Sequence, residues 1–166
     1  TVFSTTAYTY TVSVTGSLCG SPTTTGTILV QPVTTLVLSS APATANQTVC
    51  ENGSITAINY TYGGSATGIT VSGLPAGVTS SVTGNVLTIT GAPNSSVGSP
   101  YTYTVTTTGG NCGTPSMTGT ITVNPTTTLV LSSTSGTDTQ TVCLNAPITP
   151  ITYTFAGSAT GATVTG

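Results

Sequence analysis

The four cysteines are the residues of this chain whose chemistry and spacing are most informative. Cys112 follows Cys19 by 93 residues, and Cys143 follows Cys50 by the same interval. No two of them have the close spacing of a zinc-binding pair, and the chain contains no histidine to complete a site. Disulfide bonds are the better interpretation, and they imply an oxidising compartment outside the cytosol. We expect no metal and no other cofactor.

Two pairings of the cysteines obey this interval. In the first, Cys50 bonds Cys112 within one domain, while Cys19 and Cys143 bond residues outside the chain. In the second, Cys19 bonds Cys50 and Cys112 bonds Cys143, which ties neighbouring domains together. We favour the first, because domains strung end to end would hold Cys19 a domain length away from Cys50, beyond the ~7 Å limit between bridged Cα atoms. It requires Cys50 to lie at the same end of its domain as the turn that carries Cys112.

Charged side chains are almost absent. Glu51 and Asp138 are the only two, and the chain has no Lys, Arg or His. Such a chain cannot neutralise phosphates, so we expect no binding to nucleic acid or to an anionic membrane. It also lacks a general base or an activated nucleophile, so we expect no enzymatic activity. The repeat preserves neither acid, and we interpret both as solvated loop residues rather than calcium ligands.

Four tyrosines are the candidate ligand-binding residues. Tyr8 and Tyr10 alternate with threonine, and Tyr101 and Tyr103 repeat the same pattern 93 residues later. An exposed row of aromatic rings would bind carbohydrate. The interpretation that we favour is cross-strand packing of aromatic and β-branched side chains.

The interval of 93 residues extends far beyond the cysteines. Tyr8–Val12 matches Tyr101–Val105, and Gln47–Cys50 matches Gln140–Cys143. A fixed period of this length predicts an array of domains. We divide the chain into the C-terminal part of one repeat (1–32), one complete repeat (33–125) and the N-terminal part of the next (126–166). The dipeptides Gln31-Pro32 and Asn124-Pro125 mark the junctions, and their prolines favour short, extended linkers.

The complete repeat shows the alternation of polar and apolar residues that is typical of half-buried strands, and no helical period. Thr83-Gly84-Asn85 between two such segments predicts a tight hairpin. The expected strands number about seven: 36–38, 55–62, 69–71, 78–82, 86–90, 101–107 and 118–123. The fold class is therefore all-β, a tandem array of Ig-like β-sandwich domains of about 93 residues each.

Three segments carry a resemblance to a known family. Gly73–Val78, Leu87–Pro93 and Tyr101–Val105 resemble the Ig-like domains of bacterial surface proteins, which share a Gly-Leu-Pro-x-Gly turn, a later Gly-x-Pro turn and an alternating strand. The paired cysteines in near-identical tandem copies look like the giant repeat adhesins of Bacteroidota. The resemblance implies export by the type IX secretion system, a cell-surface location and kinship with gliding-motility adhesins.

We therefore expect a structural segment, the shaft of a long extracellular adhesin. Its partners would be neighbouring repeats of the same chain, other filaments or surface glycans. No apolar run is long enough to cross a membrane, so we expect no membrane insertion in this segment. The alternative is a carbohydrate-binding module of a large secreted polysaccharide-active protein, in which one or two copies would accompany a catalytic domain.

Overall fold

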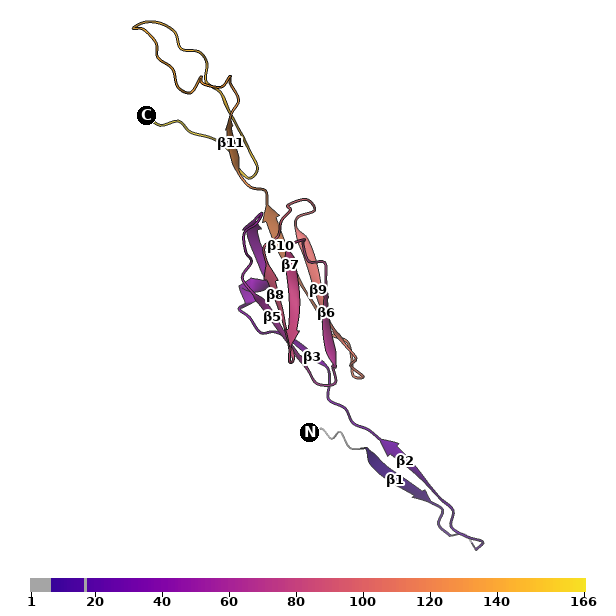
Figure 1. Ribbon diagram of the computed structural model, residues 1–166. Coiled ribbons are helices and arrows are strands. Elements are labelled where there is room, and N and C mark those ends of the chain that lie inside the picture. Colours follow the sequence, from indigo (N-terminus) through magenta and orange to yellow (C-terminus); the bar gives the residue numbers. More distant parts are fainter. Residues whose placement is uncertain (1–6, 17) are drawn as a thin grey trace.

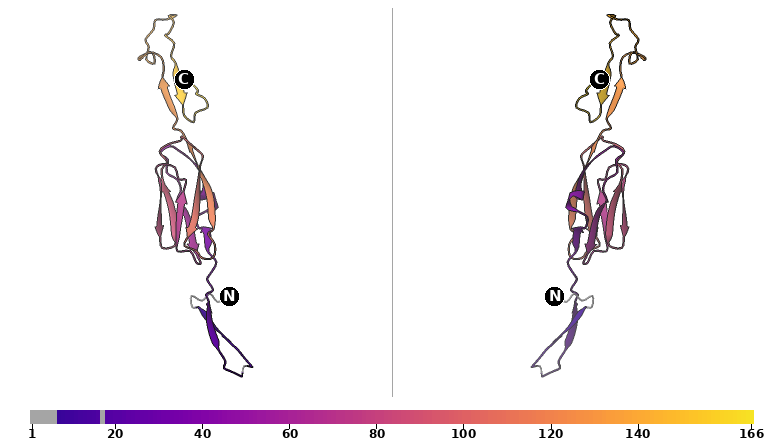
Figure 2. Two further views of the ribbon diagram at one scale, coloured as in Figure 1. Left: turned by 90° about the vertical axis from the view of Figure 1, so that its right-hand side faces the viewer. Right: turned by 90° about the vertical axis from the view of Figure 1, so that its left-hand side faces the viewer.

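A sandwich of two β-sheets lies at the middle of an extended chain, with a two-stranded hairpin before it and another after it (Figure 1). This computed structural model describes residues 7–16 and 18–166. The other seven, residues 1–6 and 17, belong to the predicted segment 1–32 and lie outside the described residues. The perpendicular views show the same elongated arrangement, so the chain enters the sandwich at one end and leaves it at the other (Figure 2).

The first sheet has the order β3-β5-β8-β7, and all of its pairs are antiparallel. Its strands are β3 (Thr35–Leu38), β5 (Ile58–Gly63), β7 (Val78–Thr83) and β8 (Val86–Gly91). The predicted hairpin between β7 and β8 is confirmed. Thr83 pairs with Val86 across it, and Gly84 has a φ of 60°, which suits glycine in a two-residue turn.

The second sheet has the order β4-β10-β9-β6 and contains one parallel pair, β4 with β10. A 3-10 turn (Pro42–Ala45) leads into β4. The strands are β4 (Asn46–Cys50), β6 (Gly68–Ser72), β9 (Tyr101–Thr108) and β10 (Ser116–Asn124). The last two, β9 and β10, pair antiparallel, with Tyr101 opposite Ile121. The sandwich therefore has eight strands, and β4 is the one that the alternation did not predict.

The core lies between the two sheets and is made by the alternating residues of their facing strands. These residues are almost fully buried: Ile58, Tyr60, Leu87 and Ile89 from the first sheet, and Tyr103, Val105, Ile121 and Val123 from the second. Burial of each large apolar side chain contributes about 1.5–3 kcal/mol. The predicted class, an all-β Ig-like sandwich, is confirmed by these two packed sheets.

The two turns that carry the family resemblance contact each other. Ala92 donates its backbone N–H to the carbonyl of Gly77 at 3.1 Å, and Asn94 donates to the carbonyl of Ala76 at 3.0 Å. Gly77 has a φ of 88°, and a Cβ there would collide with the carbonyl oxygen of Ala92. The spacing between the Gly-Leu-Pro-x-Gly and Gly-x-Pro turns therefore reflects a direct backbone contact at one end of β7 and β8.

Each flanking hairpin repeats a pair of strands of the sandwich. The first consists of β1 (Tyr8–Ser13) and β2 (Thr23–Ile28), and Tyr8 pairs with Ile28 as Tyr101 pairs with Ile121. The second consists of β11 (Thr128–Leu131) and β12 (Tyr153–Ala156), which keep the register of β3 and β5. The strand pairing thus recurs at the interval seen in the sequence.

Candidate functional site: the junction between repeats

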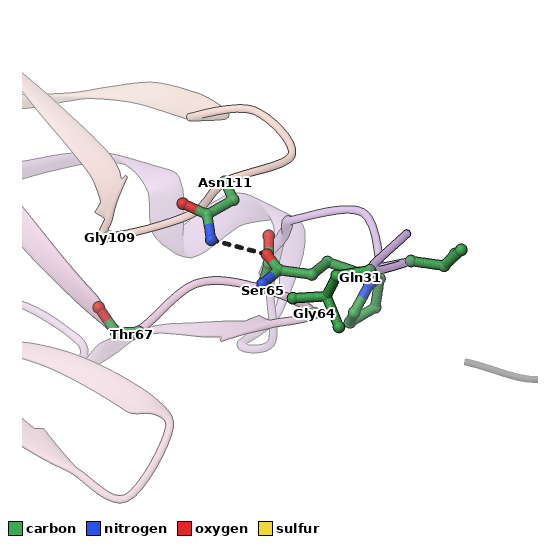
Figure 3. Close-up of a pocket in the computed structure, with 9 residues that line it drawn as sticks. Gln31, Gly64, Ser65, Thr67, Gly109 and Asn111 are labelled. Carbon is green, nitrogen blue, oxygen red and sulfur yellow. Dashed lines mark hydrogen bonds between the residues drawn. The ribbon is translucent and has the colours of Figure 1, made fainter. Parts of the chain in front are cut away.

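A small pocket marks the junction where the chain enters the sandwich. It has a volume of ≈ 270 Å³, which is below the range of about 300–1,000 Å³ that is usual for small-molecule sites. Three segments line it: the linker 29–32, the loop 64–67 after β5, and Gly109 and Asn111 of the turn between β9 and β10 (Figure 3). The pocket is therefore the place where a linker lies against a domain.

Neutral hydrogen bonds hold this junction together. Asn111 donates through Nδ2 to Oε1 of Gln31 at 2.8 Å, the contact drawn in Figure 3. The hydroxyl oxygens of Thr34 and Ser65 lie 2.7 Å apart. Thr34 also donates its backbone N–H to the carbonyl of Cys112 at 3.4 Å. These contacts fix the direction in which the linker enters the domain.

The junction after the sandwich has the same local arrangement. The hydroxyl oxygens of Thr127 and Ser158 lie 2.8 Å apart, and those of the matching residues Thr34 and Ser65 lie 2.7 Å apart. Gly157 has a φ of 80° and approaches the carbonyl of Thr126 so closely that a Cβ would collide with it. Gly64 makes the same approach to the linker before the sandwich. The segment Gly-Ser-Ala-Thr-Gly, which occurs at 64–68 and again at 157–161, is thus a linker-binding loop, a role that the sequence did not reveal.

The structure does not bring Cys50 and Cys112 together. Cys50 ends β4, where it is the register partner of Asn124 at the end of β10. Cys112 lies in the turn before β10, so the nine residues of β10 separate them, a distance of about 30 Å along a strand. Both are exposed free thiols. The predicted bridge within one domain fails its own condition, because the two cysteines occupy opposite ends of the sandwich.

The second predicted pairing is also incompatible with this arrangement. Cys19 belongs to the turn between β1 and β2, which lies at the tip of the first hairpin, away from the sandwich (Figure 1). Cys50 lies at the opposite end of the sandwich, beside the strand that leads to β11. Cys143 lies in the long loop between β11 and β12. The prediction that Cys19 and Cys143 bond residues outside the chain stays a prediction.

The tyrosines differ in their surroundings. Tyr103 is fully buried, so it is not available to a surface ligand, and this candidate is corrected to a core residue. Burial and the hydroxyl of Tyr60 raise the pKa of Tyr103 well above its ordinary value. Tyr101 is half-buried; its hydroxyl donates to the carbonyl of Val97 and lies 3.2 Å from the carbonyl of Ser95. Tyr8 and Tyr10, which match these two, are exposed on the first hairpin.

Glu51 has a more definite role than that of a solvated loop residue. Its carboxylate accepts a hydrogen bond from the backbone N–H of Ser96 at 2.6 Å. The side chain and backbone of Ser96, and the backbone of Thr126, hold the pKa of Glu51 below its ordinary value. The carboxylate thus lies at the junction after the sandwich, and its hydrogen bond with Ser96 holds the connection between β8 and β9 against that junction.

Within residues 7–16 and 18–166, no three His, Cys, Asp or Glu side chains come together as a metal site. No helix in the described part of the chain has the length and apolar character needed to span a membrane. The arrangement that the structure does offer is a sandwich domain with a hydrogen-bonded linker at each end.

Comparisons with known proteins give only structural similarities. The M3 domain of titin matches at 16% identity with a TM-score of 0.39, covering 56% of this chain and 96% of that domain. The kinase region of twitchin from C. elegans matches at 16% identity, with a TM-score of 0.38 and coverage of 56% and 16%. The extracellular domain of protocadherin GammaB4 matches at 14% identity, with a TM-score of 0.44 and coverage of 90% and 26%. This chain thus spans about a quarter of the protocadherin chain and less of the twitchin chain.

No family model matches the sequence, and a search of curated proteins finds no match.

Proposed function

We propose that this chain is part of the shaft of a long extracellular surface adhesin, built from tandem Ig-like repeats of about 93 residues. Residues 1–32 and 126–166 would be parts of the repeats before and after the complete one. The observation that carries the proposal is that the chain enters the sandwich at one end and leaves it at the other, with the same linker contacts at both junctions (Figure 1). Repeats of this kind extend into a line.

A mechanical role agrees with the chemistry of the surface. The chain has two carboxylates and no basic residue, so charge-driven recognition and acid–base catalysis have little to act through. Hydrogen bonds between neutral side chains hold the junctions, and their strength depends little on salt. The sequence resemblance suggests a Bacteroidota adhesin exported by the type IX secretion system, a class that includes adhesins for gliding. Neighbouring repeats, other filaments and surface glycans are its proposed partners.

The alternative, a carbohydrate-binding module, loses part of its basis. Its candidate residues included Tyr103, which is inside the core. The pocket at the junction is small and is lined by the linker itself.

Electron microscopy of the full-length protein, released from cells without denaturant, tests the proposal. We expect a thin beaded fibre with a repeat of about 30–40 Å, the length of a domain built on strands of about nine residues. Separate globules without a linear repeat would contradict it.

A further inference from the structure

Cys112 and Cys50 each lie beside a junction between repeats, Cys112 at the junction before the sandwich and Cys50 at the junction after it. At the junction before the sandwich, Sγ of Cys112 lies 3.8 Å from the carbonyl oxygen of Gln31. At the junction after it, Cys50 is the register partner of Asn124. The carbonyl of Asn124 accepts a hydrogen bond from Glu51, the next residue after Cys50, at 2.9 Å.

Gln31 and Asn124 are the same position of two successive repeats. They are 93 residues apart, each precedes a proline, and three residues after each a threonine makes the same hydroxyl contact with the segment that follows. We call the cysteine at the repeat position of Cys50 and Cys143 the Cys50-type cysteine, and the one at the position of Cys19 and Cys112 the Cys112-type cysteine. In a complete array, the carbonyl at this position therefore has a Cys50-type cysteine beside it from the repeat before. It also has a Cys112-type cysteine beside it from the repeat after. Neither junction of this chain contains both, because the flanking repeats are present only in part.

We propose that a disulfide joins each repeat to the next, between the Cys50-type cysteine of one repeat and the Cys112-type cysteine of the following one. The proposal rests on the tandem extracellular array proposed above. Cys50 then bonds the turn between β9 and β10 of the repeat that follows, and Cys112 bonds the end of β4 of the repeat that precedes. Both thiols are exposed at the ends of the sandwich, where a neighbouring domain would meet them.

The oxidation is an ordinary thiol–disulfide exchange. The two thiols form one S–S bond and release two protons, and their two electrons reduce an external disulfide, such as that of a thiol–disulfide oxidoreductase, to two thiols. Such an oxidant is a normal component of the compartments in which secreted proteins acquire disulfides.

The bridge changes how the array carries load. After a bridge ends at Cys112, the covalent path need follow the chain for only 31 residues, to Cys143, where the next bridge begins. Each bridge together with the segment that follows it advances along the array by two repeats. The shortest covalent path therefore contains about 16 residues of chain per repeat. The same path contains 93 residues per repeat when there are no bridges, and 31 when each bridge lies inside one domain. Reduction should therefore increase the fully stretched length about sixfold.

Thiol counting on the full-length protein tests the pairing. The protein is isolated without reductant, denatured and labelled with a maleimide, and labelled thiols are counted by mass. We expect Cys50→Ser to expose one additional thiol per chain, and the double variant Cys50→Ser/Cys112→Ser to expose two. The two freed cysteines belong to different junctions and cannot pair with each other. A bridge within the domain predicts no additional thiol in the double variant, and that result would overturn the proposal.

Two further results would also overturn it. One is full labelling of every cysteine in the wild-type protein, which means that no bridge exists. The other is a label on Cys19 or Cys143 in the double variant, which indicates the pairing of Cys19 with Cys50. Peptide mapping identifies Cys19 by the Leu18 that precedes it and Cys143 by the Leu144 that follows it.

Single-molecule stretching provides a readout that does not depend on variants. A sixfold increase in stretched length per repeat after reduction supports the bridge between repeats, and an increase of about threefold or no increase contradicts it. Microscopy separates this inference from the proposed function. A beaded fibre with free thiols would leave the shaft in place and remove the bridge, whereas globules would remove the shaft itself.

Discussion

The hydroxyl oxygens of Tyr60 and Tyr103 lie 3.1 Å apart in the core and join the two sheets of the sandwich. Tyr103 has one proton and donates it to the carbonyl of Ala45 at 3.1 Å, so it accepts the proton of Tyr60. Ala45 precedes β4, the edge strand that ends at Cys50. A chain of three groups thus connects the first sheet, the second sheet and the segment that positions one of the cysteines.

Tyr103→Phe should destabilise the domain by about 1–3 kcal/mol. The change leaves the hydroxyl of Tyr60 and the carbonyl of Ala45 without their partner in a buried site. Tyr62→Phe is the matched control, because its hydroxyl makes one exposed contact at 3.3 Å and Phe155 already occupies the matching position. We expect this control to change stability by less than about 0.5 kcal/mol. Urea denaturation measures both, and equal losses would contradict the role of the pair.

Gly119→Ala should be at least as costly. Gly119 faces Tyr103 across β9 and β10, and a Cβ there would collide with the phenol ring and with the carbonyl of Ala45. Overpacking of this kind costs typically about 1–3 kcal/mol, which for a domain of this size lowers the melting temperature by roughly 4–8 °C per kcal/mol. Gly161→Ala, where a Cβ would meet nothing within 4 Å, is the control. Thermal unfolding with no difference between the two variants would contradict the contact.

Glu51 should give the domain an acid-sensitive stability. Its pKa is lower in the folded chain than in the unfolded chain, chiefly because of the hydrogen bonds from Ser96. The stabilisation is therefore complete above the unfolded pKa of about 4.3 and is lost as the pH falls through the folded value. Glu51→Gln should lower stability at pH 7 and show a smaller decrease between pH 6 and pH 3, whereas Asp138→Asn serves as a control. Denaturation midpoints measured between pH 3 and pH 6 test this prediction. Parallel curves of stability against pH for the wild type and Glu51→Gln would contradict it.

Most strands could be predicted because their signal is local. The alternation through Ile58, Tyr60 and Tyr62 identifies β5, and the Gly84-Asn85 turn identifies the hairpin of β7 and β8. The period located the linkers, because Pro32 and Pro125 repeat. The same signals would apply to any sandwich of this class, so they established the fold and not the site.

β4 and the ends at which the cysteines lie could not be predicted in this way. β4 is short and pairs in parallel with β10, whose sequence position is more than 65 residues later, and its side chains alternate between exposed and half-buried rather than fully buried. Its direction decides that Cys50 lies beside Asn124 and away from Cys112. A β4 antiparallel to β10 would have placed the two cysteines at one end, as the sequence interpretation required. The pairing of a single edge strand therefore determines which cysteines can meet.

The flanking hairpins offer a final prediction, since they have the sequence and register of sandwich strands but lack the opposite sheet. Tyr10 is 50% exposed, whereas the matching Tyr103 is fully buried. A two-stranded hairpin alone is marginally stable in water, so its hydrogen bonds should open with little cost. In hydrogen-exchange mass spectrometry of residues 1–166, amides of β1 should exchange at least about a hundredfold faster than those of β9. Adding the residues that complete the first repeat should slow β1 to the rate of β9, because the same side chains would then be buried. If β1 already matches β9 in the shorter chain, the hairpin is stable by itself and the repeat does not need its second sheet.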